Sequence, residues 1–286
     1  MHNPAAVRIQ LERTLKQDET NICDYLAAES GLPKSRIKHA MNCGALQVRS
    51  GKGKVQRLRR SSKGLPSGSR IWLYYDAGLL SLTPPQPILL EDFKSYSIWF
   101  KPPGLLSQGS QWGDHYSLLR QVELHFQHRR KVFLVHRLDQ DACGLMLVAH
   151  RKQQSADLSR MFTERGIEKF YRVRVEGAMQ CESGVIDSPI EGKSALTRYR
   201  VLAHTRDQNQ ENESTLLEVK IETGRKHQIR RHFSQLGHAV VGDALYGVKN
   251  SCGLHLAATK LVYKCPEQGR IVCVELDRAH IDRYWM

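Results

Sequence analysis

The sequence predicts an α+β protein in which a small basic N-terminal domain precedes a larger second domain. Residues 81–87 contain three prolines, which favour a semi-rigid linker over a helix or a central strand. After this linker, short strands alternate with isolated helices without a regular βαβ rhythm. No segment recurs with the period of a repeat protein. We therefore assign residues 1–80 to a small α/β domain and residues 88–286 to the second domain.

The N-terminal part carries more than half of the net positive charge. Residues 1–87 contain 14 Lys and Arg against 6 Asp and Glu, and the whole chain has a net charge of +14. Between Glu29 and Asp76 there are eleven Lys or Arg and no acid. A patch of one sign attracts polyanions, so we expect nucleic acid as the partner. A membrane surface is the alternative, but the basic stretch lacks a long apolar face, and no run approaches the roughly 18 apolar residues of a spanning helix.

The N-terminal domain is expected to contain two helices followed by two strands. Residues 23–29 form a short helical stretch. The second helix begins near Pro33 and ends at Gly44. Its apolar stripe consists of Ile37, Ala40 and Met41. Leu46 and Val48 then begin one strand, and a turn in PSGSRIWLYY, residues 66–75, leads into another.

Two elements of the second domain are clear from their periodicity. Residues 152–165 form a helix with Leu158, Met161 and Phe162 buried and Gly166 as its cap. In EKFYRVRVEG, residues 168–177, the period is two, with Tyr171, Val173 and Val175 on one face. This segment is therefore predicted to be a strand.

The stretch HRLDQDACGLMLVAH, residues 136–150, places a carboxylate in a turn between two buried strands. The apolar runs 132–135 and 145–149 read as these strands. A loop held at both ends can fix the side chain of Asp139 for chemistry. Alternatively, Asp139 caps the turn and pairs with Arg137, and on this stretch alone the structural interpretation is favoured.

A second stretch, residues 222–247, combines cations with an amphipathic helix. Four Lys or Arg and two His are interleaved in ETGRKHQIRRHF. Ile229, Phe233 and Leu236 follow a spacing of i, i+4 and i+7, which predicts a helix with one buried face and Gly237 as its cap. Taken alone, the segment is typical of a solvated basic helix.

Together these two stretches resemble the RluA-type pseudouridine synthases. The match comprises HRLD, Gly144 and the apolar run that follows, then GR-HQIR-H and GDALYG, in the family's order. KPPG at 101–104 resembles the family's K-P-x-G turn, and the resemblance spans about residues 88–286. Ala142 and Cys143 replace the usual Thr and Ser, and His150 replaces Lys.

The resemblance implies a long mixed, mainly antiparallel sheet with a central cleft, and an isomerase that converts uridine to pseudouridine without a cofactor. It makes Asp139 the catalytic carboxylate and Arg230 the residue that pairs with it. Tyr171 matches the tyrosine that stacks on the target base, although a core aromatic on a strand is the simpler interpretation. Stacking suits an enzyme that must hold a base outside a helix.

Several other residues are candidates for RNA contact. Arg137 lies two residues from Asp139, so both side chains share a face, and in the family this arginine helps to hold the flipped nucleotide. Arg225 and His227 contact phosphate or support the loop. Lys101 could bind RNA or be structural, whereas Gly242, Asp243 and Gly247 are interpreted as turn residues.

Residues 15–76 resemble the small RNA-binding module named after ribosomal protein S-four, also called the αL motif. In that module Arg36 and Lys38 would lie on the helix face that follows an RNA backbone. The chain departs from the module in a longer basic segment, KGKVQRLRRSSKG, for which a flexible insertion is the alternative. Either interpretation supplies phosphate contacts that position RNA without reading its sequence.

The remaining expectations concern redox state, location and substrate. The seven cysteines show no metal or disulfide spacing, so we expect reduced thiols and no metal. The N-terminus is too polar for a secretory signal, which favours a cytoplasmic location. We also expect a monomer. Large-subunit ribosomal RNA is the favoured substrate and transfer RNA the alternative. An RNA-binding or ribosome-assembly factor on an enzyme scaffold is the second hypothesis, and an RNA hydrolase is the weakest.

Overall fold

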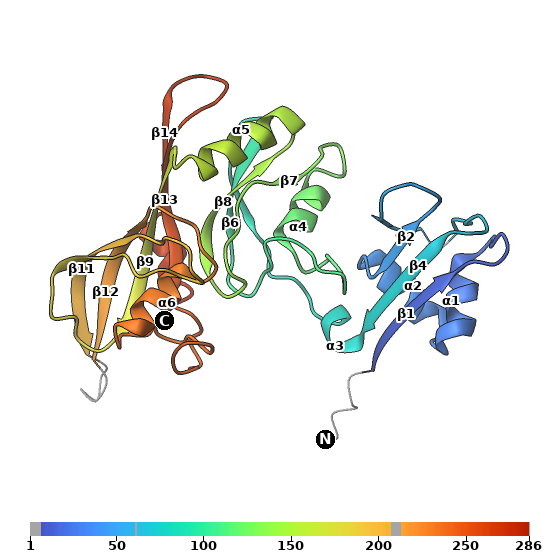
Figure 1. Cartoon of the computed structure of the whole chain (residues 1–286), viewed down its shortest axis with the longest axis horizontal. Helices are drawn as coiled ribbons and strands as arrows, with labels where there is room; N and C mark the ends of the chain where they lie inside the picture. The colour runs from blue at the N-terminus through green and yellow to red at the C-terminus, as the bar shows by residue number, and fades with distance from the viewer. Residues whose placement is uncertain (1–6, 61, 207–212, 286) are drawn as a thin grey trace. The chain divides into compact units, whose positions relative to one another are not determined.

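The computed structural model describes residues 7–60, 62–206 and 213–285, and it contains two compact units (Figure 1). Unit 1 comprises Met1–Pro84 and Gln108–His125, and unit 2 comprises Pro85–Ser107 and Phe126–Met286. The division after Pro84 falls in the proline-rich segment, where residues 82–87 form neither helix nor strand. Gln108–His125 follows this segment in the sequence but is part of unit 1.

Unit 1 is a four-stranded antiparallel sheet, in the order β1-β4-β2-β3, with short helices. Its elements are β1 (Arg8–Thr14), α1 (Ile22–Ser30), α2 (Lys34–Asn42), β2 (Leu46–Arg49), β3 (Gln56–Arg57), β4 (Arg70–Asp76), α3 (Ala77–Leu80) and α4 (Leu118–His125). The predicted helices and strands are confirmed. Strand β1 was not predicted because its apolar alternation is limited to Ile9 and Leu11, and only Leu11 is buried in the structure.

Part of the basic segment in unit 1 is held by an acid. Asp114 accepts from the guanidinium groups of Arg57 and Arg59 at 3.1 and 2.5 Å. Trp112, two residues earlier, packs edge-on against Tyr74 and beneath the guanidinium of Arg8. The segment is therefore not simply a flexible basic insertion, because two of its arginines are paired within the unit.

Unit 2 is built on a ten-stranded sheet that is mainly antiparallel (Figure 1). The order is β10-β11-β12-β9-β13-β8-β6-β5, with β14 beside β13 and β7 beside β8, and β13 and β8 run parallel. The strands are β5 (Ile88–Asp92), β6 (Tyr96–Lys101), β7 (Phe133–Leu134), β8 (Cys143–Ala149), β9 (Ile167–Glu176), β10 (Ser183–Ile186), β11 (Thr197–Arg206), β12 (Glu213–Ile221), β13 (Leu256–Lys264) and β14 (Ile271–Glu275). The predicted α+β class with a long mixed sheet is confirmed.

Three helices accompany this sheet, namely α5 (Lys152–Thr163), α6 (Gln228–Gln235) and α7 (Arg278–Asp282). The alternation predicted for β9 is confirmed, since Tyr171 and Val173 are buried and their neighbours are half-exposed. The buried face predicted for helix α6 is confirmed at Ile229 and Phe233, whereas Leu236 follows the helix and is 45% exposed. Arg230 and His232 are buried as well, which a solvated basic helix would not show. No helix among the described residues is long and apolar enough to span a membrane.

Gly144 allows β8 to lie directly against β13. Its φ is +120°, and a Cβ atom there would lie 2.2 Å from the carbonyl oxygen of Ala258. We expect Gly144→Ala to lower the free energy of unfolding by at least about 3 kcal/mol, because both the backbone and the packing oppose a side chain. Urea unfolding measures this loss. Gly31→Ala is the control, since φ is +69° there but no atom lies within 4 Å. Equal losses in the two variants would contradict the packing argument.

Candidate active site

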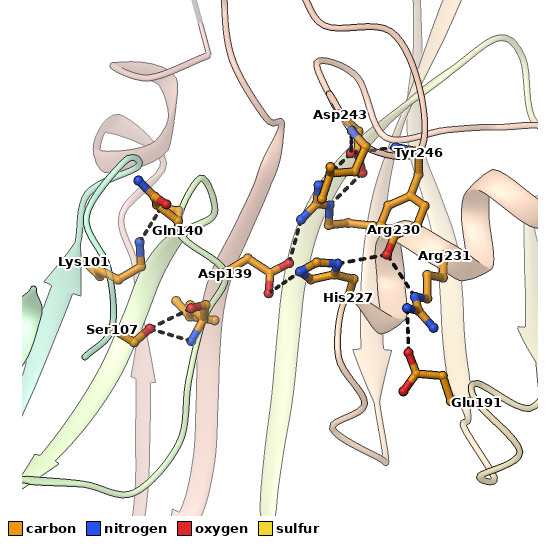
Figure 2. A network of polar contacts seen from close by, with 12 residues as sticks. Lys101, Ser107, Asp139, Gln140, Glu191, His227, Arg230, Arg231, Asp243 and Tyr246 are labelled. Carbon is orange, nitrogen blue, oxygen red and sulfur yellow. Dashed lines mark hydrogen bonds and ion pairs between the residues drawn. The ribbon is translucent and has the colours of Figure 1, made fainter. Parts of the chain in front are cut away.

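Asp139 lies in the loop between β7 and β8, and that loop is fixed on both sides of the carboxylate (Figure 2). The Ser107 hydroxyl donates to the Leu138 carbonyl at 2.7 Å and accepts from the Leu138 amide at 3.1 Å. On the other side, the Lys101 ammonium donates to the Gln140 carbonyl at 2.9 Å. The backbone on either side of Asp139 is thus held by buried side chains from one neighbouring segment.

Lys101 is a buried support and not a surface cation. Its side chain is 0% exposed and also donates to the carbonyls of Pro102 and Leu105, at 3.0 and 2.7 Å. Burial lowers the pKa of Lys101 to about 7, but three carbonyl acceptors require three N–H donors and so favour the ammonium. The expectation that Lys101 contacts RNA is wrong, because no part of it is accessible.

Arg230, on α6, joins two carboxylates. One guanidinium nitrogen lies 3.1 Å from Asp139 Oδ2, and two others donate to Asp243 at 2.7 Å each. The side chain of Arg230 is 5% exposed and that of Asp243 is 0% exposed. Burial alone would lower the pKa of Arg230, but the hydrogen bonds to Asp243 and Asp139 outweigh it and raise the pKa. The predicted pairing of Arg230 with Asp139 is present in this geometry.

Asp243 is more than the turn residue that the sequence suggested. It accepts hydrogen bonds from the amides of Leu245 and Tyr246, as a turn residue would, while both oxygens bind Arg230. Burial raises the pKa of Asp243, but the Arg230 hydrogen bond and the two amides outweigh it and hold the pKa below the ordinary value. A carboxylate that ionises this readily fixes the guanidinium in place beside Asp139.

His227 lies on the other side of Asp139. Its Nε2 is 3.7 Å from Asp139 Oδ1, and its Nδ1 is 3.0 Å from the Tyr246 hydroxyl (Figure 2). The backbone of His227 is left-handed, with φ 53° and ψ 33°, which is a strained conformation for a residue other than glycine. Burial lowers the pKa of His227, although the Asp139 charge opposes this, so the neutral imidazole is favoured.

The hydrogen bonds around Tyr246 assign the tautomer of His227. Arg231 Nε donates to the Tyr246 oxygen at 3.0 Å, and Arg231 is itself held by Glu191 at 2.8 Å. The Asp139 carboxylate on the Nε2 side favours the imidazole proton there, and Nδ1 then accepts the single phenol proton of Tyr246. The imidazole proton therefore lies on Nε2, which faces the Asp139 carboxylate.

This arrangement predicts a role for a hydroxyl that does not touch Asp139. Tyr246→Phe is expected to lower the turnover number roughly tenfold, because the Nε2–H tautomer is no longer fixed. RNA affinity should stay within about twofold, since the ring is retained. Single-turnover kinetics and a binding titration measure the two quantities. A loss of affinity with unchanged turnover would contradict the positioning role.

A cavity of about 780 Å³ joins these groups to the rest of the predicted site. Its lining includes six of the nine residues selected from the sequence: Arg137, Asp139, Tyr171, Arg225, His227 and Arg230. Tyr171, on β9, is buried beside the carboxylate, and burial and then the Asp139 charge raise the pKa of its phenol. Arg137 is exposed. Arg36 and Lys38 belong to unit 1, on the exposed face of α2.

Sequence reasoning missed Gln228, the buried amide inside the HQIR motif. Its oxygen accepts from the Thr223 hydroxyl and the Arg225 amide at 2.7 and 3.1 Å. Its nitrogen donates to the Leu196 carbonyl and the Thr197 hydroxyl. A side-chain amide can accept and donate hydrogen bonds at the same time, so Gln228 fixes the loop that places Arg225 at the cavity.

The described residues contain no group of three His, Cys, Asp or Glu that could hold a metal.

Comparison with known proteins identifies chains that are similar to this one. The family model described as RNA pseudouridylate synthase matches residues 95–235. The chain is 34% identical over 266 residues to an uncharacterized RNA pseudouridine synthase of Aquifex aeolicus, covering 84% of this chain and 81% of the relative. It is 33% identical to the dual-specificity RNA pseudouridine synthase RluA of Vibrio cholerae, over 58% of this chain and 72% of that one.

Two further similarities concern another named relative and a solved structure. Identity to the ribosomal large subunit pseudouridine synthase D of Nitrosomonas europaea is 36%, over 57% of this chain and 50% of the relative. The solved structure of human RNA pseudouridylate synthase domain containing 1 superposes with a TM-score of 0.59 at 24% identity, covering 71% of this chain and 91% of that one. The structural match supports the same fold for both.

Proposed function

Because this chain belongs to the RluA-type RNA pseudouridine synthases, we propose that it converts uridine in large-subunit ribosomal RNA to pseudouridine, with Asp139 as the catalytic carboxylate. The family makes the protein an isomerase that acts on RNA. The observation that carries the assignment of Asp139 is its position, between Arg230 and His227, at the wall of a cavity that also contains Tyr171.

The reaction rearranges bonds without a net gain or loss of atoms. The bond from ribose C1′ to the base nitrogen breaks, the uracil rotates, and C1′ bonds to carbon five. Carbon five gives up its proton to solvent, and the freed base nitrogen takes one up. An ionised Asp139 can act as nucleophile or as electrostatic partner while the base is detached. The Arg230 guanidinium at 3.1 Å and the His227 Nε2–H stabilise that negative charge and orient it.

Tyr171 is suited to hold the base during this rotation. Its ring lines the cavity next to Asp139, and the phenol stays protonated because burial raises its pKa. A ring face supports a flat base without fixing its rotation in the plane. The cavity of about 780 Å³ has the size of pockets that enclose small ligands, as a nucleotide turned out of a helix requires.

Unit 1 is proposed to be the S-four-like RNA-binding module, which would position the RNA. Arg36 and Lys38 are exposed on α2 and make no ion pair with any residue that the structure describes. Free cations on one helix face are available to phosphates, whereas Arg57 and Arg59 are already paired with Asp114. Residues 1–80 would thus add affinity, and unit 2 would perform the chemistry.

Ribosomal RNA is favoured over transfer RNA because the Nitrosomonas relative is named for the large ribosomal subunit and unit 1 is basic. The test is to map pseudouridines in both RNA classes from strains with and without the gene. We expect at least one large-subunit ribosomal site to disappear and to return with the wild-type gene, but not with Asp139→Asn. Loss of transfer RNA sites alone would overturn the proposed substrate.

A further inference from the structure

Lys169 is a buried cation in the active-site cavity that the mechanism above does not use. It lies on β9 two residues before Tyr171, so both side chains project from the same face of the strand. Lys169 is 7% exposed and lines the same cavity as Asp139. Its side chain makes no hydrogen bond or ion pair with any described residue, and its Nζ is not fully enclosed, so the ammonium reaches the open space of the cavity.

A second unpaired cation lies close by. Arg165, just before β9, lines the same cavity and makes no ion pair within the described chain. Burial lowers the pKa of Lys169, and the Arg165 charge lowers it further, as expected for two cations that line one cavity. His136 is neutral and neither adds to this positive charge nor balances it, since burial and then the Lys169 charge lower its pKa to about 3 and its Nε2 accepts from the Leu147 amide.

The acids of the cavity do not balance this pair of cations. Asp139 is held by Arg230 and His227, and Glu222 is bound to Arg198 at 2.8 Å. Lys169 and Arg165 therefore line the same cavity without a counter-charge from its acids. Arg165 is exposed to solvent, whereas Lys169 is largely enclosed, so an anionic ligand would supply the charge that the surroundings of Lys169 lack.

We propose that Lys169 and Arg165 form a phosphate subsite, which binds the RNA backbone beside the uridine that stacks on Tyr171. The identity of the ligand rests on the proposed function. A phosphodiester supplies one negative charge and several acceptor oxygens, which match two cations. A uracil carbonyl is neutral, so it would leave both charges uncompensated.

The first test compares the binding of uridine with that of uridine 5′-monophosphate and 3′-monophosphate to the wild-type protein. We expect at least one monophosphate to bind roughly tenfold or more tightly than uridine, as a charge-assisted contact would give. Measuring both identifies which side of the nucleotide carries the bound phosphate. Lys169→Met should remove this preference. Lys220→Gln is the matched control, because it also removes one charge, but Lys220 pairs with Glu168 on the opposite face of the sheet.

The second test separates ligand binding from structural support. Lys169→Met removes an unpaired buried charge and keeps a long apolar chain, so we expect its melting temperature without RNA to equal or exceed that of the wild type. A lysine that stabilised the fold would give a lower melting temperature. A stable variant that has lost the monophosphate preference would support the subsite.

Other outcomes would overturn it. Equal binding of uridine and both monophosphates by the wild type would exclude a phosphate site. Loss of uridine binding itself in Lys169→Met would show that the ammonium contacts the base. These binding results do not depend on turnover. If the wild-type protein formed pseudouridine but showed no preference for a monophosphate, the proposed function would stand and the phosphate subsite would be wrong.

Discussion

Asp139→Asn is expected to lower the rate of pseudouridine formation by at least roughly ten-thousandfold and to leave RNA affinity within about threefold. The amide keeps the size and hydrogen-bonding oxygen of the carboxylate but cannot act as a nucleophile or carry its negative charge. Arg230 stays in place because its two hydrogen bonds to Asp243 do not depend on Asp139. Single-turnover kinetics at saturating enzyme measure the rate, and a binding titration measures the affinity.

Asp141→Asn is the matched control for this result. Asp141 lies two residues further along the same loop, is exposed, and does not line the cavity. Its substitution by Asn makes the same change in charge and shape as Asp139→Asn. We expect its rate to stay within about threefold of the wild type. If both variants were equally active, the carboxylate of Asp139 would not be the catalytic group.

Arg230→Met is expected to lower the free energy of unfolding by about 3–5 kcal/mol, in addition to abolishing turnover. The loss follows because Asp243, which is 0% exposed, would keep its charge in the interior without its guanidinium partner. Adding Asp243→Asn should recover part of the stability, since the amide is neutral and its oxygen can still accept from Leu245 and Tyr246. Turnover should not recover, because Asp139 still lacks Arg230.

Urea unfolding of the two single variants and the double variant measures the coupling between Arg230 and Asp243. The pH dependence of stability is a second measure of the same pair. The pKa of Asp243 is held below its ordinary value of 3.8, so the stabilising pair is fully formed above that pH and is lost as the pH falls further. The stability difference between the wild type and Asp243→Asn should therefore shrink below about pH 4. Additive losses in the double variant would contradict the buried pair.

The sequence predicted where the site lies in the chain better than the hydrogen bonds and ion pairs within it. Asp139 was placed in a turn between buried strands because two apolar runs flank it, and the structure has the turn between two strands, of which β8 is buried and β7 is half-buried. The pairing of Asp139 with Arg230 came from the family resemblance alone. The link from Arg230 to Asp243 joins residues thirteen positions apart across a turn, and no periodicity reports it.

The errors have related physical causes. Lys101 was left open between RNA contact and a structural role, because its three carbonyl partners come from backbone that carries no sequence signal. Leu236 was placed in the core on spacing alone, but it follows the last residue of α6 and is exposed. Lys169 reads as one more charged residue of a strand, and only the fold shows that it faces the cavity.

The most direct test of the central claim is the release of tritium from RNA labelled at carbon five of its uridines. The RNA is isolated from a strain lacking the gene, so that its target sites are unmodified, and is incubated with the purified protein. We predict release by the wild type, none by Asp139→Asn, and confinement of the release to the large-subunit ribosomal fraction. Tight binding of RNA without release from any RNA class would contradict the assignment of this chain as an active uridine isomerase.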